Sequence, residues 1–297
     1  MNLLATQLNM KSFNKSSTAE EVTEGLDLSG QTILVTGCNS GLGLEKMRVL
    51  AMRGARVLGT ARTAEKAANA CNSIEGNTVP LVCDLSEPNS VKELIESVNE
   101  PLHAIIANAG VMALQERTIK HGIESHFLVN HIGHFMLVNG LLDRLTTNGR
   151  IVVLASAAHA FARGNNVNFD DITWNRPYKP WSAYGYSKLA NILFAKELGK
   201  RLPEGQTSNS LHPGIIYTPL WRHIPEPEAD KMKAAYGFKT IEQGAATGVF
   251  LATHPSVENV SGEYFSNCKI GSPSALAQDD NLAKHLWEVT EKLVARF

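Results

Sequence analysis

The stretch TILVTGCNSGLG, residues 32–43, places an apolar run of strand length directly before a turn that contains three glycines. A helical pattern, LEKMRVLAMRG, follows at residues 44–54. Gly37 permits a tight turn, Gly41 lets the backbone approach a pyrophosphate, and Gly43 allows the helix to pack closely on the strand. The helix N-terminus adds free N–H groups and a partial positive charge, which favour phosphate. The stretch therefore predicts a strand–turn–helix unit that binds a dinucleotide, with a glycine turn that holds no ligand as the alternative.

Strands and helices are expected to alternate along the rest of the chain. Apolar runs of strand length recur at TILVTG, ARVLGTA, TVPLVCD, HAIIANAG, RIVVLAS and NSLHPG, and helix-length segments separate most of them. Runs that are apolar throughout are typical of strands buried on both faces. Such strands, joined by right-handed helical crossovers, form a doubly wound and mostly parallel sheet with helices on both faces. We therefore expect an α/β protein with a single-domain Rossmann fold.

The length of the chain fits one large domain. Its 297 residues, of which 43% are hydrophobic, are enough to bury a full core within one α/β unit. We expect that domain at residues 28–297, after a flexible polar leader at residues 1–27. A capping box that begins at Ser17 or Thr18 and uses Glu20 or Glu21 predicts one short helix in the leader.

Charge and cysteine usage exclude several classes of partner. Lys and Arg total 28 against 29 for Asp and Glu, and no stretch gathers them into the basic stripe that nucleic acid requires. No window stays apolar for the roughly 18 residues of a membrane span, and the first residues lack the apolar core of a signal peptide. Four cysteines without CxxC spacing indicate reduced thiols. We expect a cytoplasmic protein with no nucleic-acid partner and no membrane span.

Two long segments interrupt the alternation, at about residues 157–181 and 215–240. Both follow predicted strands at their carboxyl ends, where open α/β sheets hold ligands, and long loops at such places are commonly functional. We therefore interpret them as substrate loops. The first one is rich in aromatic residues, which either line an apolar substrate mouth or form a small core of their own: Phe161, Phe169, Trp174, Tyr178 and Trp181.

Within SAYGYSKLAN, residues 182–191, Tyr184 and Lys188 are four positions apart and share one face of a helix. A free phenol has a pKa of about 10, which is too high for an efficient base at neutral pH. A nearby ammonium favours phenolate and lowers that pKa. The pair therefore predicts a general acid/base, while an aromatic–lysine packing pair is the alternative. Tyr186 should point elsewhere, because it lies about 200° away around the helix.

The second predicted strand ends with LGTAR, which places Arg62 where a dinucleotide-binding unit meets the adenosine ribose. An acidic residue there accepts a hydrogen bond from the 2′-hydroxyl, whereas a guanidinium suits a 2′-phosphate. Arg62 therefore favours NADP(H) over NAD(H), and a solvated loop arginine is the alternative.

Three histidines close in the sequence, His126, His131 and His134, raise the question of a metal site. No HExxH motif or further carboxylate ligand completes such a site. We interpret them as packing or surface histidines and expect no metal.

Taken in order, these motifs resemble the short-chain dehydrogenase/reductase family. The loop has the TGxxxGxG form, NAG at 108–110 resembles the NNAG turn with Ala107 in place of the first Asn, and VNHIGHF, a strand-end serine, YxxxK and HPG follow. STAEEV, NHIGHF, AYGYSKLAN, NSLHPG and SGEYFSNC are most similar to the branch with retinol dehydrogenases, WW-domain oxidoreductases and plant protein-import-associated reductases. The resemblance runs from about Leu28 to the end of the chain.

The resemblance implies a role for each matching residue. Ser156 would bind the substrate oxygen, Tyr184 would donate or accept the proton, and Lys188 would bind the nicotinamide ribose and lower the pKa of Tyr184. Asn130 would hold a water that links Lys188 to solvent. The residues implied in cofactor binding are Gly37, Asn39, Ser40, Gly41, Leu42, Gly43, Arg62, Asp84, Leu85, Asn108, Ala109, Gly110, Tyr184, Lys188, Pro213, Gly214 and Thr218, with Asp84 beside the adenine and Thr218 at the carboxamide.

The resemblance further implies an oxidoreductase of the EC 1.1.1 type that uses NADP(H), with NAD(H) the less favoured cofactor. Its reaction would interconvert an alcohol and a ketone or aldehyde by hydride transfer on a bulky apolar small molecule, in a homodimer or homotetramer. A non-catalytic module that senses NADP(H) is the alternative, although the four intact site residues argue against it. An epimerase or dehydratase on this scaffold would instead have a TGxxGxxG loop and a longer substrate domain.

Overall fold

The glycine turn follows the first strand of a central sheet in the computed structural model, which describes residues 13–162 and 167–297. The 8-stranded sheet has the order β10-β9-β8-β7-β4-β1-β2-β3. Neighbouring strands are parallel except β9 and β10, which pair antiparallel. The strands are β1 (Thr32–Val35), β2 (Arg56–Ala61), β3 (Thr78–Val82), β4 (Leu102–Ala107), β7 (Leu145–Leu154), β8 (Thr207–His212), β9 (Tyr264–Ser266) and β10 (Lys269–Ile270).

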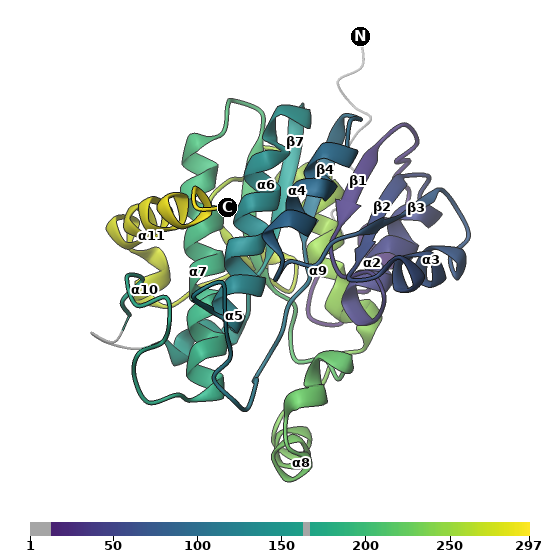
Figure 1. Ribbon diagram of the computed structural model, residues 1–297. Coiled ribbons are helices and arrows are strands. Elements are labelled where there is room, and N and C mark those ends of the chain that lie inside the picture. Colours follow the sequence, from purple (N-terminus) through teal and green to yellow (C-terminus); the bar gives the residue numbers. More distant parts are fainter. Residues whose placement is uncertain (1–12, 163–166) are drawn as a thin grey trace.

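The central strands are buried on both faces, which explains their unbroken apolar runs. Ile33 and Val35 of β1 pack into one core, and Leu34 between them packs into the other. The first core contacts α2 (Gly41–Met52), α3 (Ala64–Asn72) and α9 (Ile241–Thr253), and the second contacts α4 (Pro88–Ser97), α6 (Gly133–Gly140) and α7 (Pro180–Arg201) (Figure 1). The prediction of a doubly wound, mostly parallel sheet with helices on both faces is confirmed.

Shorter elements connect and extend this frame. A hairpin of β5 (Ile119–Lys120) and β6 (Ile123–Glu124) lies outside the main sheet. The C-terminal helix α11 (Asp280–Val294) packs against α7. The remaining elements are α1 (Ala19–Val22), α5 (Ser125–Phe127), η1 (Leu128–Ile132), η2 (Leu142–Arg144), η3 (Ala157–Phe161), η5 (Pro219–His223), α8 (Glu226–Ala235), η6 (Pro255–Val257) and α10 (Ala275–Gln278).

The short helix α1 begins with a capping box. Thr18 Oγ1 accepts from the Glu21 backbone N–H at 3.2 Å, and Glu21 Oε2 accepts from the Thr18 N–H at 2.8 Å. Ala19 and Val22 are buried, and α1 packs against α9. Residues 1–12 of the expected leader lie outside the described residues, so the division at residues 27 and 28 stays a prediction.

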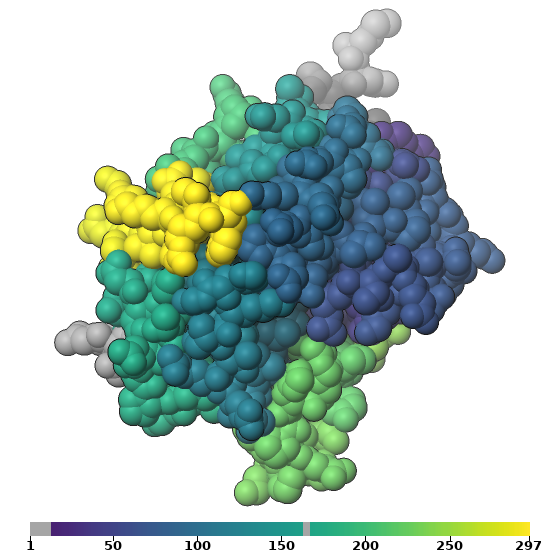
Figure 2. Space-filling view, viewed as in Figure 1, coloured from purple at the N-terminus to yellow at the C-terminus, as the bar shows by residue number. Residues whose placement is uncertain are grey.

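Helix α8 projects from the body of the molecule, as the ribbon and the space-filling view both show (Figures 1 and 2). It lies within the second long segment, residues 215–240, and η5 precedes it. The segment that the sequence indicated as a loop therefore contains two helical elements of its own, η5 and α8.

Candidate active site

A cleft opens at the carboxyl ends of β1 to β4, where the strand order reverses between β1 and β4. We call it the switch-point cleft; its walls include the glycine turn 37–43 and residues that follow β2, β3 and β4. Open α/β sheets bind their ligands at this position. The topology alone therefore marks the cleft as the first candidate site.

The glycine turn is shaped for close approach of an anion. Gly37 and Gly41 have φ values of 73° and 57°, in the left-handed region that favours glycine. A Cβ on Gly43 would lie 2.1 Å from Gly37 O, so the helix could not start so close to the turn with a larger residue. The Ser40 side chain makes no capping hydrogen bond, which leaves the first amide groups of α2 available to a phosphate.

Asn108 fixes this turn to the end of β4. Its Nδ2 donates to Thr36 O at 2.8 Å, and the backbone N–H groups of Asn108 and Ala109 both donate to Thr36 Oγ1 at 2.9 Å. Its Oδ1 accepts from Lys46 Nζ at 2.7 Å. The retained Asn of the NAG turn thus ties β1, α2 and β4 together behind the cleft.

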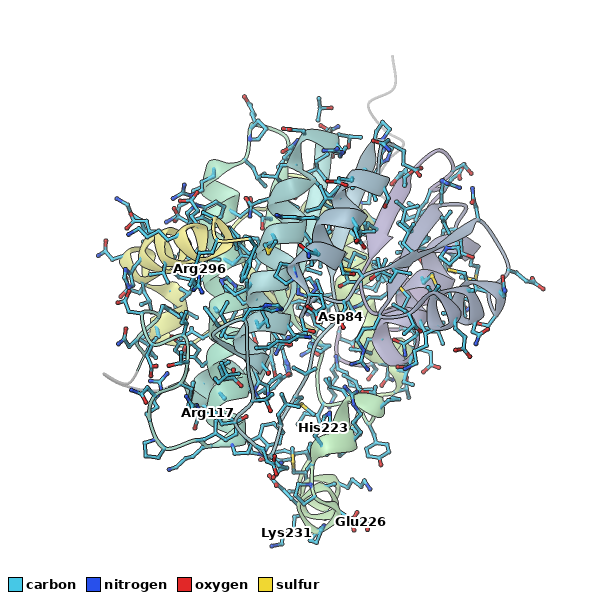
Figure 3. The ribbon with its side chains drawn as sticks, viewed as in Figure 1. Asp84, Arg117, His223, Glu226, Lys231 and Arg296 are labelled. Carbon is cyan, nitrogen blue, oxygen red and sulfur yellow. The ribbon has the colours of Figure 1, made fainter. Side chains whose placement is uncertain are left out.

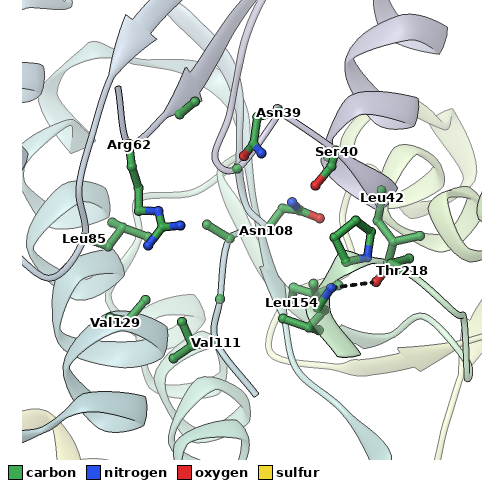
Figure 4. A pocket seen from close by; sticks show the side chains of 18 of the residues that line it. Asn39, Ser40, Leu42, Arg62, Leu85, Asn108, Val111, Val129, Leu154 and Thr218 are labelled. Atoms are coloured by element: carbon green, nitrogen blue, oxygen red, sulfur yellow. Dashed lines mark hydrogen bonds between the residues drawn. The ribbon is translucent and has the colours of Figure 1, made fainter. Parts of the chain in front are cut away.

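Two arginines line one end of the cleft, Arg62 after β2 (Figure 4) and Arg222 in η5. Neither forms an ion pair within the described residues. Burial and, second, the positive charge of Arg62 lower the pKa of Arg222. Asp84 lines the same end, and Figure 3 shows it above the turn that carries His223. The sequence indicated Arg62 and Asp84 but missed Arg222, because nothing in the sequence shows where the second long segment runs.

Ser156, Tyr184 and Lys188 meet in a second cavity that adjoins the cleft. Ser156 follows β7 and caps η3 through a 3.1 Å bond from Ala158 N–H. Gly185 lets α7 pack on that turn, because a Cβ there would lie 2.4 Å from Ala158 O. Lys188 Nζ lies 5.7 Å from the Tyr184 ring centroid and donates to Leu154 O at 2.9 Å.

The pKa of Tyr184 differs from the expectation. Burial raises the pKa of Tyr184 to about 12, and a hydrogen bond with Ser156 offsets this only in part. Burial also lowers the pKa of Lys188 to about 7, so its charge is weakened near neutral pH. Burial therefore dominates the pKa of Tyr184 in this structure, and the lowering of that pKa by Lys188 stays a prediction.

Asn130 lies behind the cavity in η1, a π-helical turn of a kind that often occurs at functional sites. Its Nδ2 donates to Val111 O at 3.0 Å and to Ser187 Oγ at 2.9 Å, and its Oδ1 accepts from Val111 N–H at 2.8 Å. A Cβ on Gly110 would lie 2.9 Å from Asn130 Oδ1 and 3.7 Å from Lys188 Nζ. Asn130 therefore holds the chain beyond β4 next to Lys188.

The second cavity, which we call the apolar pocket, is walled mainly by carbon. Its lining residues include Met112, which follows β4, and apolar residues of both long segments: Phe161, Trp181, Ile216, Trp221, Met232 and Tyr236. Of the loop aromatics, Phe161 and Trp181 line this pocket, whereas Phe169 and Trp174 are buried in a separate core. Tyr178 packs against that core and donates from its hydroxyl to Leu114 O at 2.9 Å. The loop aromatics therefore divide between the apolar pocket and a small core, and a substrate in that pocket stays a prediction.

The predicted site residues fall into three places. Those in the walls of the switch-point cleft are Gly37, Asn39, Ser40, Gly41, Leu42, Gly43, Arg62, Asp84, Leu85, Asn108, Ala109, Gly110 and Thr218. Those in the walls of the apolar pocket are Ser156, Tyr184, Lys188, Pro213 and Gly214, with Leu42, Asn108, Gly110 and Thr218 shared. Asn130 lies behind both. Sequence reasoning missed Arg222 and Lys46.

The three histidines bind different partners. His126 Nδ1 lies 2.8 Å from Glu124 Oε1, His131 Nε2 lies 2.9 Å from Thr290 Oγ1, and His134 Nε2 lies 2.9 Å from Thr36 Oγ1. Residues 13–162 and 167–297 contain no group of three or more His, Cys, Asp or Glu side chains arranged to hold a metal ion. In the same part of the chain, no helix is both long enough and apolar enough to cross a membrane.

Fold and site together define a nucleotide-dependent oxidoreductase, and comparison with known proteins agrees. A family model described as short chain dehydrogenase matches residues 31–229, and the chain belongs to that family. "Short-chain dehydrogenase TIC 32 B, chloroplastic" of Brassica napus is 41% identical over 95% of this chain and 94% of its own length. The WW domain-containing oxidoreductase of Gallus gallus is 37% identical over 95% and 72%, and human retinol dehydrogenase 13 is 36% identical over 90% and 85%. The resemblance to this branch of the family is confirmed.

Solved structures share the fold. A crystal structure of an uncharacterised protein from Mycobacterium paratuberculosis superposes with a TM-score of 0.77 at 31% identity, covering 92% of this chain and 97% of that one. A short chain dehydrogenase from Burkholderia cenocepacia, solved in complex with NADP, has a TM-score of 0.66 at 25% identity, covering 80% and 96%.

Proposed function

We propose that this oxidoreductase uses NADP(H) to interconvert an alcohol and a ketone or aldehyde on a bulky apolar substrate. One observation carries the proposal: Ser156, Tyr184 and Lys188 line an apolar pocket that shares a wall with the switch-point cleft. A substrate in the pocket and a dinucleotide in the cleft would meet at that shared wall.

The residues of the cleft fit a dinucleotide. The left-handed glycines and the open N-terminus of α2 suit a pyrophosphate, and Asp84 suits the adenosine. Arg62 and Arg222 supply two guanidinium groups to the wall of the cleft, and guanidinium groups suit a 2′-phosphate, which supports NADP(H) over NAD(H). When bound, the nicotinamide supplies or accepts the hydride, and the protein supplies position and charge.

Tyr184 and Ser156 handle the substrate oxygen in this proposal. The Ser156 hydroxyl and the Tyr184 phenol both line the pocket, and Ser156 is near enough to lower the Tyr184 pKa. A carbonyl oxygen that contacts both hydroxyl groups would receive two donors. In reduction, Tyr184 gives its proton to the oxygen while the carbon receives hydride. Its high pKa in this structure keeps the proton on the phenol until that moment. Lys188 would bind the ribose, and Asn130 would keep Lys188 in reach of a proton path.

A panel of aromatic and terpenoid ketones, followed through NADPH absorbance, tests the activity. Tyr184→Phe should lower kcat by at least about a hundredfold, because it removes the proton donor. Tyr186→Phe is the matched control, since the Tyr186 hydroxyl donates to Asn168 O, away from the pocket. Undiminished turnover in Tyr184→Phe would refute the mechanism. Tight NADPH binding with no turnover across the panel would instead favour the non-catalytic module.

Compartment and assembly belong to the same proposal. The cysteines at 38, 71, 83 and 268 are all unpaired, as in a reducing cytosol, whereas the Brassica napus relatives carry "chloroplastic" in their names. We propose that the protein is located in the cytoplasm and forms a homodimer or homotetramer. Cell fractionation and light scattering after size-exclusion chromatography measure the two properties.

A further inference from the structure

Lys46 of α2 is completely buried, with an exposed fraction of 0%, and the proposed chemistry does not use it. Lysine is among the residues least often buried without a partner, because desolvation of its charge is costly. Within the described residues, Lys46 forms no ion pair, and its single hydrogen bond is the one to Asn108 Oδ1 at 2.7 Å. Such a lysine destabilises the fold, so a compensating role elsewhere is expected.

The structure makes space for this side chain. A Cβ on Gly248 of α9 would lie 2.6 Å from Lys46 Cε and 3.1 Å from Nζ. The missing side chain of Gly248 therefore provides the channel that Lys46 occupies. The channel ends at Asn108, which lines both the switch-point cleft and the apolar pocket. The Lys46 ammonium therefore lies one side chain away from the cleft wall, out of contact with water.

Among the residues that the structure describes, no group around Lys46 supplies a negative charge. Its titratable neighbours are Cys38, after β1, and Lys188, on α7. The Cys38 thiol donates to Val35 O at 3.1 Å, and burial raises its pKa, so it stays neutral. From β4 and α9, Lys46 meets Asn108 and Gly248, which do not titrate. The ammonium has no countercharge until an anion enters the cleft.

We propose that Lys46 is a positioning residue for the dinucleotide, whose phosphates provide the countercharge that the fold withholds from this buried ammonium. The inference rests on the dinucleotide binding of the proposed function and not on its substrate. The dinucleotide then binds more tightly at pH values at which Lys46 is protonated. Asn108, which accepts a hydrogen bond from Lys46, connects the ammonium to the cleft wall. Because burial lowers the pKa of Lys46 to about 7, that contribution should fade as the pH rises above neutral.

The test is the affinity for NADPH, measured by fluorescence titration, in Lys46→Met, which keeps the length of the side chain without its charge. We expect the variant to bind about tenfold more weakly near pH 6, and the two proteins to converge near pH 9, where Lys46 of the wild type is neutral. The ratio of the two dissociation constants removes the titration of the cofactor phosphate, which is common to both proteins. Lys284→Met, an exposed lysine of α11, should match the wild type at both pH values.

Lys46→Gln separates charge from hydrogen bonding, since it offers Asn108 a neutral donor. Lys46→Gln should lose as much NADPH affinity near pH 6 as Lys46→Met does. It also replaces Lys46→Met in the test if that variant folds poorly. An equal loss at both pH values, or wild-type affinity in Lys46→Gln, would overturn the proposal in favour of a structural hydrogen bond. A wild-type protein that binds no NADPH at either pH would refute the proposed function itself.

Discussion

Arg62 and Arg222 of the switch-point cleft reach it from distant parts of the chain. Arg62 follows β2, while Arg222 lies in the turn η5 beyond β8, next to Trp221 of the apolar pocket. Two consecutive residues of η5 therefore line the two cavities: Trp221 lines the apolar pocket and Arg222 lines the switch-point cleft. A contact between Arg222 and a bound dinucleotide would also fix the wall of the apolar pocket.

The cofactor preference can be tested at these two positions. Arg62→Asp should weaken NADPH binding by about ten- to a hundredfold, because a charge-assisted bond is replaced by repulsion, and should change NADH binding far less. Arg222→Gln should show a smaller loss with the same preference. Arg117→Gln, in which an exposed side chain bonds Thr173 O, is the control. Dissociation constants for both cofactors measure this, and equal losses for NADPH and NADH would refute the assignment.

Individual site residues could be predicted from the sequence where a motif places them at the end of a strand or on one face of a helix. Lys46 was within reach of the same reasoning, because it shares the inner face of α2 with Gly43 and Leu50. Its burial, however, depends on Gly248, about 200 positions later in the chain, which leaves the space it fills. A single sequence carries no sign of that pairing.

Among the elements, α7 and α8 are linked across the mouth of the apolar pocket. Trp181 Nε1 at the start of α7 donates to Glu228 Oε1 on α8 at 2.6 Å. Trp181 lines the pocket, as does Met232 of the projecting α8. The hydrogen bond should therefore hold α8 in place over a large substrate.

Glu228→Ala should raise KM for a bulky ketone about fivefold with little change in kcat, since one partly exposed charge-assisted bond contributes about 1 kcal/mol. Glu226→Ala, an exposed position on the same helix, is the matched control. Steady-state kinetics with a bulky and a small ketone decide the matter. An equal effect on the small ketone, or a loss confined to kcat, would contradict this role for α8.

The elements that the sequence predicted are those with long apolar runs, such as β1, β4 and β7. The strands β9 and β10, only 3 and 2 residues long, were missed because they depend on pairing with β8 and with each other. The π-helical turn that carries Asn130 was missed for another reason: its extra residue per turn is set by the bonds of Asn130 to Val111 and Ser187. Tertiary contacts decide both features.

For the whole molecule, the buried lysines make stability depend on pH. Burial lowers the pKa of both Lys46 and Lys188 from 10.5 to about 7 in the folded protein. Between these values the unfolded chain binds protons that the folded chain does not, so the free energy of unfolding rises with pH. Above about pH 8.5 the buried cysteines act in the opposite sense, because burial raises their pKa values while the unfolded thiols ionise.

From pH 7 to about 8.5, a comparison of variants isolates Lys46, because the buried histidines, the cysteines and Lys239 titrate alike in the proteins compared. Urea unfolding there should give a free energy that increases with pH by up to about 1.4 kcal/mol per pH unit for each lysine. Lys46→Met should lower the slope by up to about 1.4 kcal/mol per pH unit relative to the wild type, and Lys284→Met should leave it unchanged. A flat profile in the wild type, or an unaltered slope in Lys46→Met, would mean that Lys46 keeps its proton in the folded protein. Saturating NADPH should make the free energy of unfolding of the wild type less dependent on pH. The cofactor phosphates would favour protonation of the lysines in the folded protein, so bound NADPH would stabilise the folded state most at the lower pH.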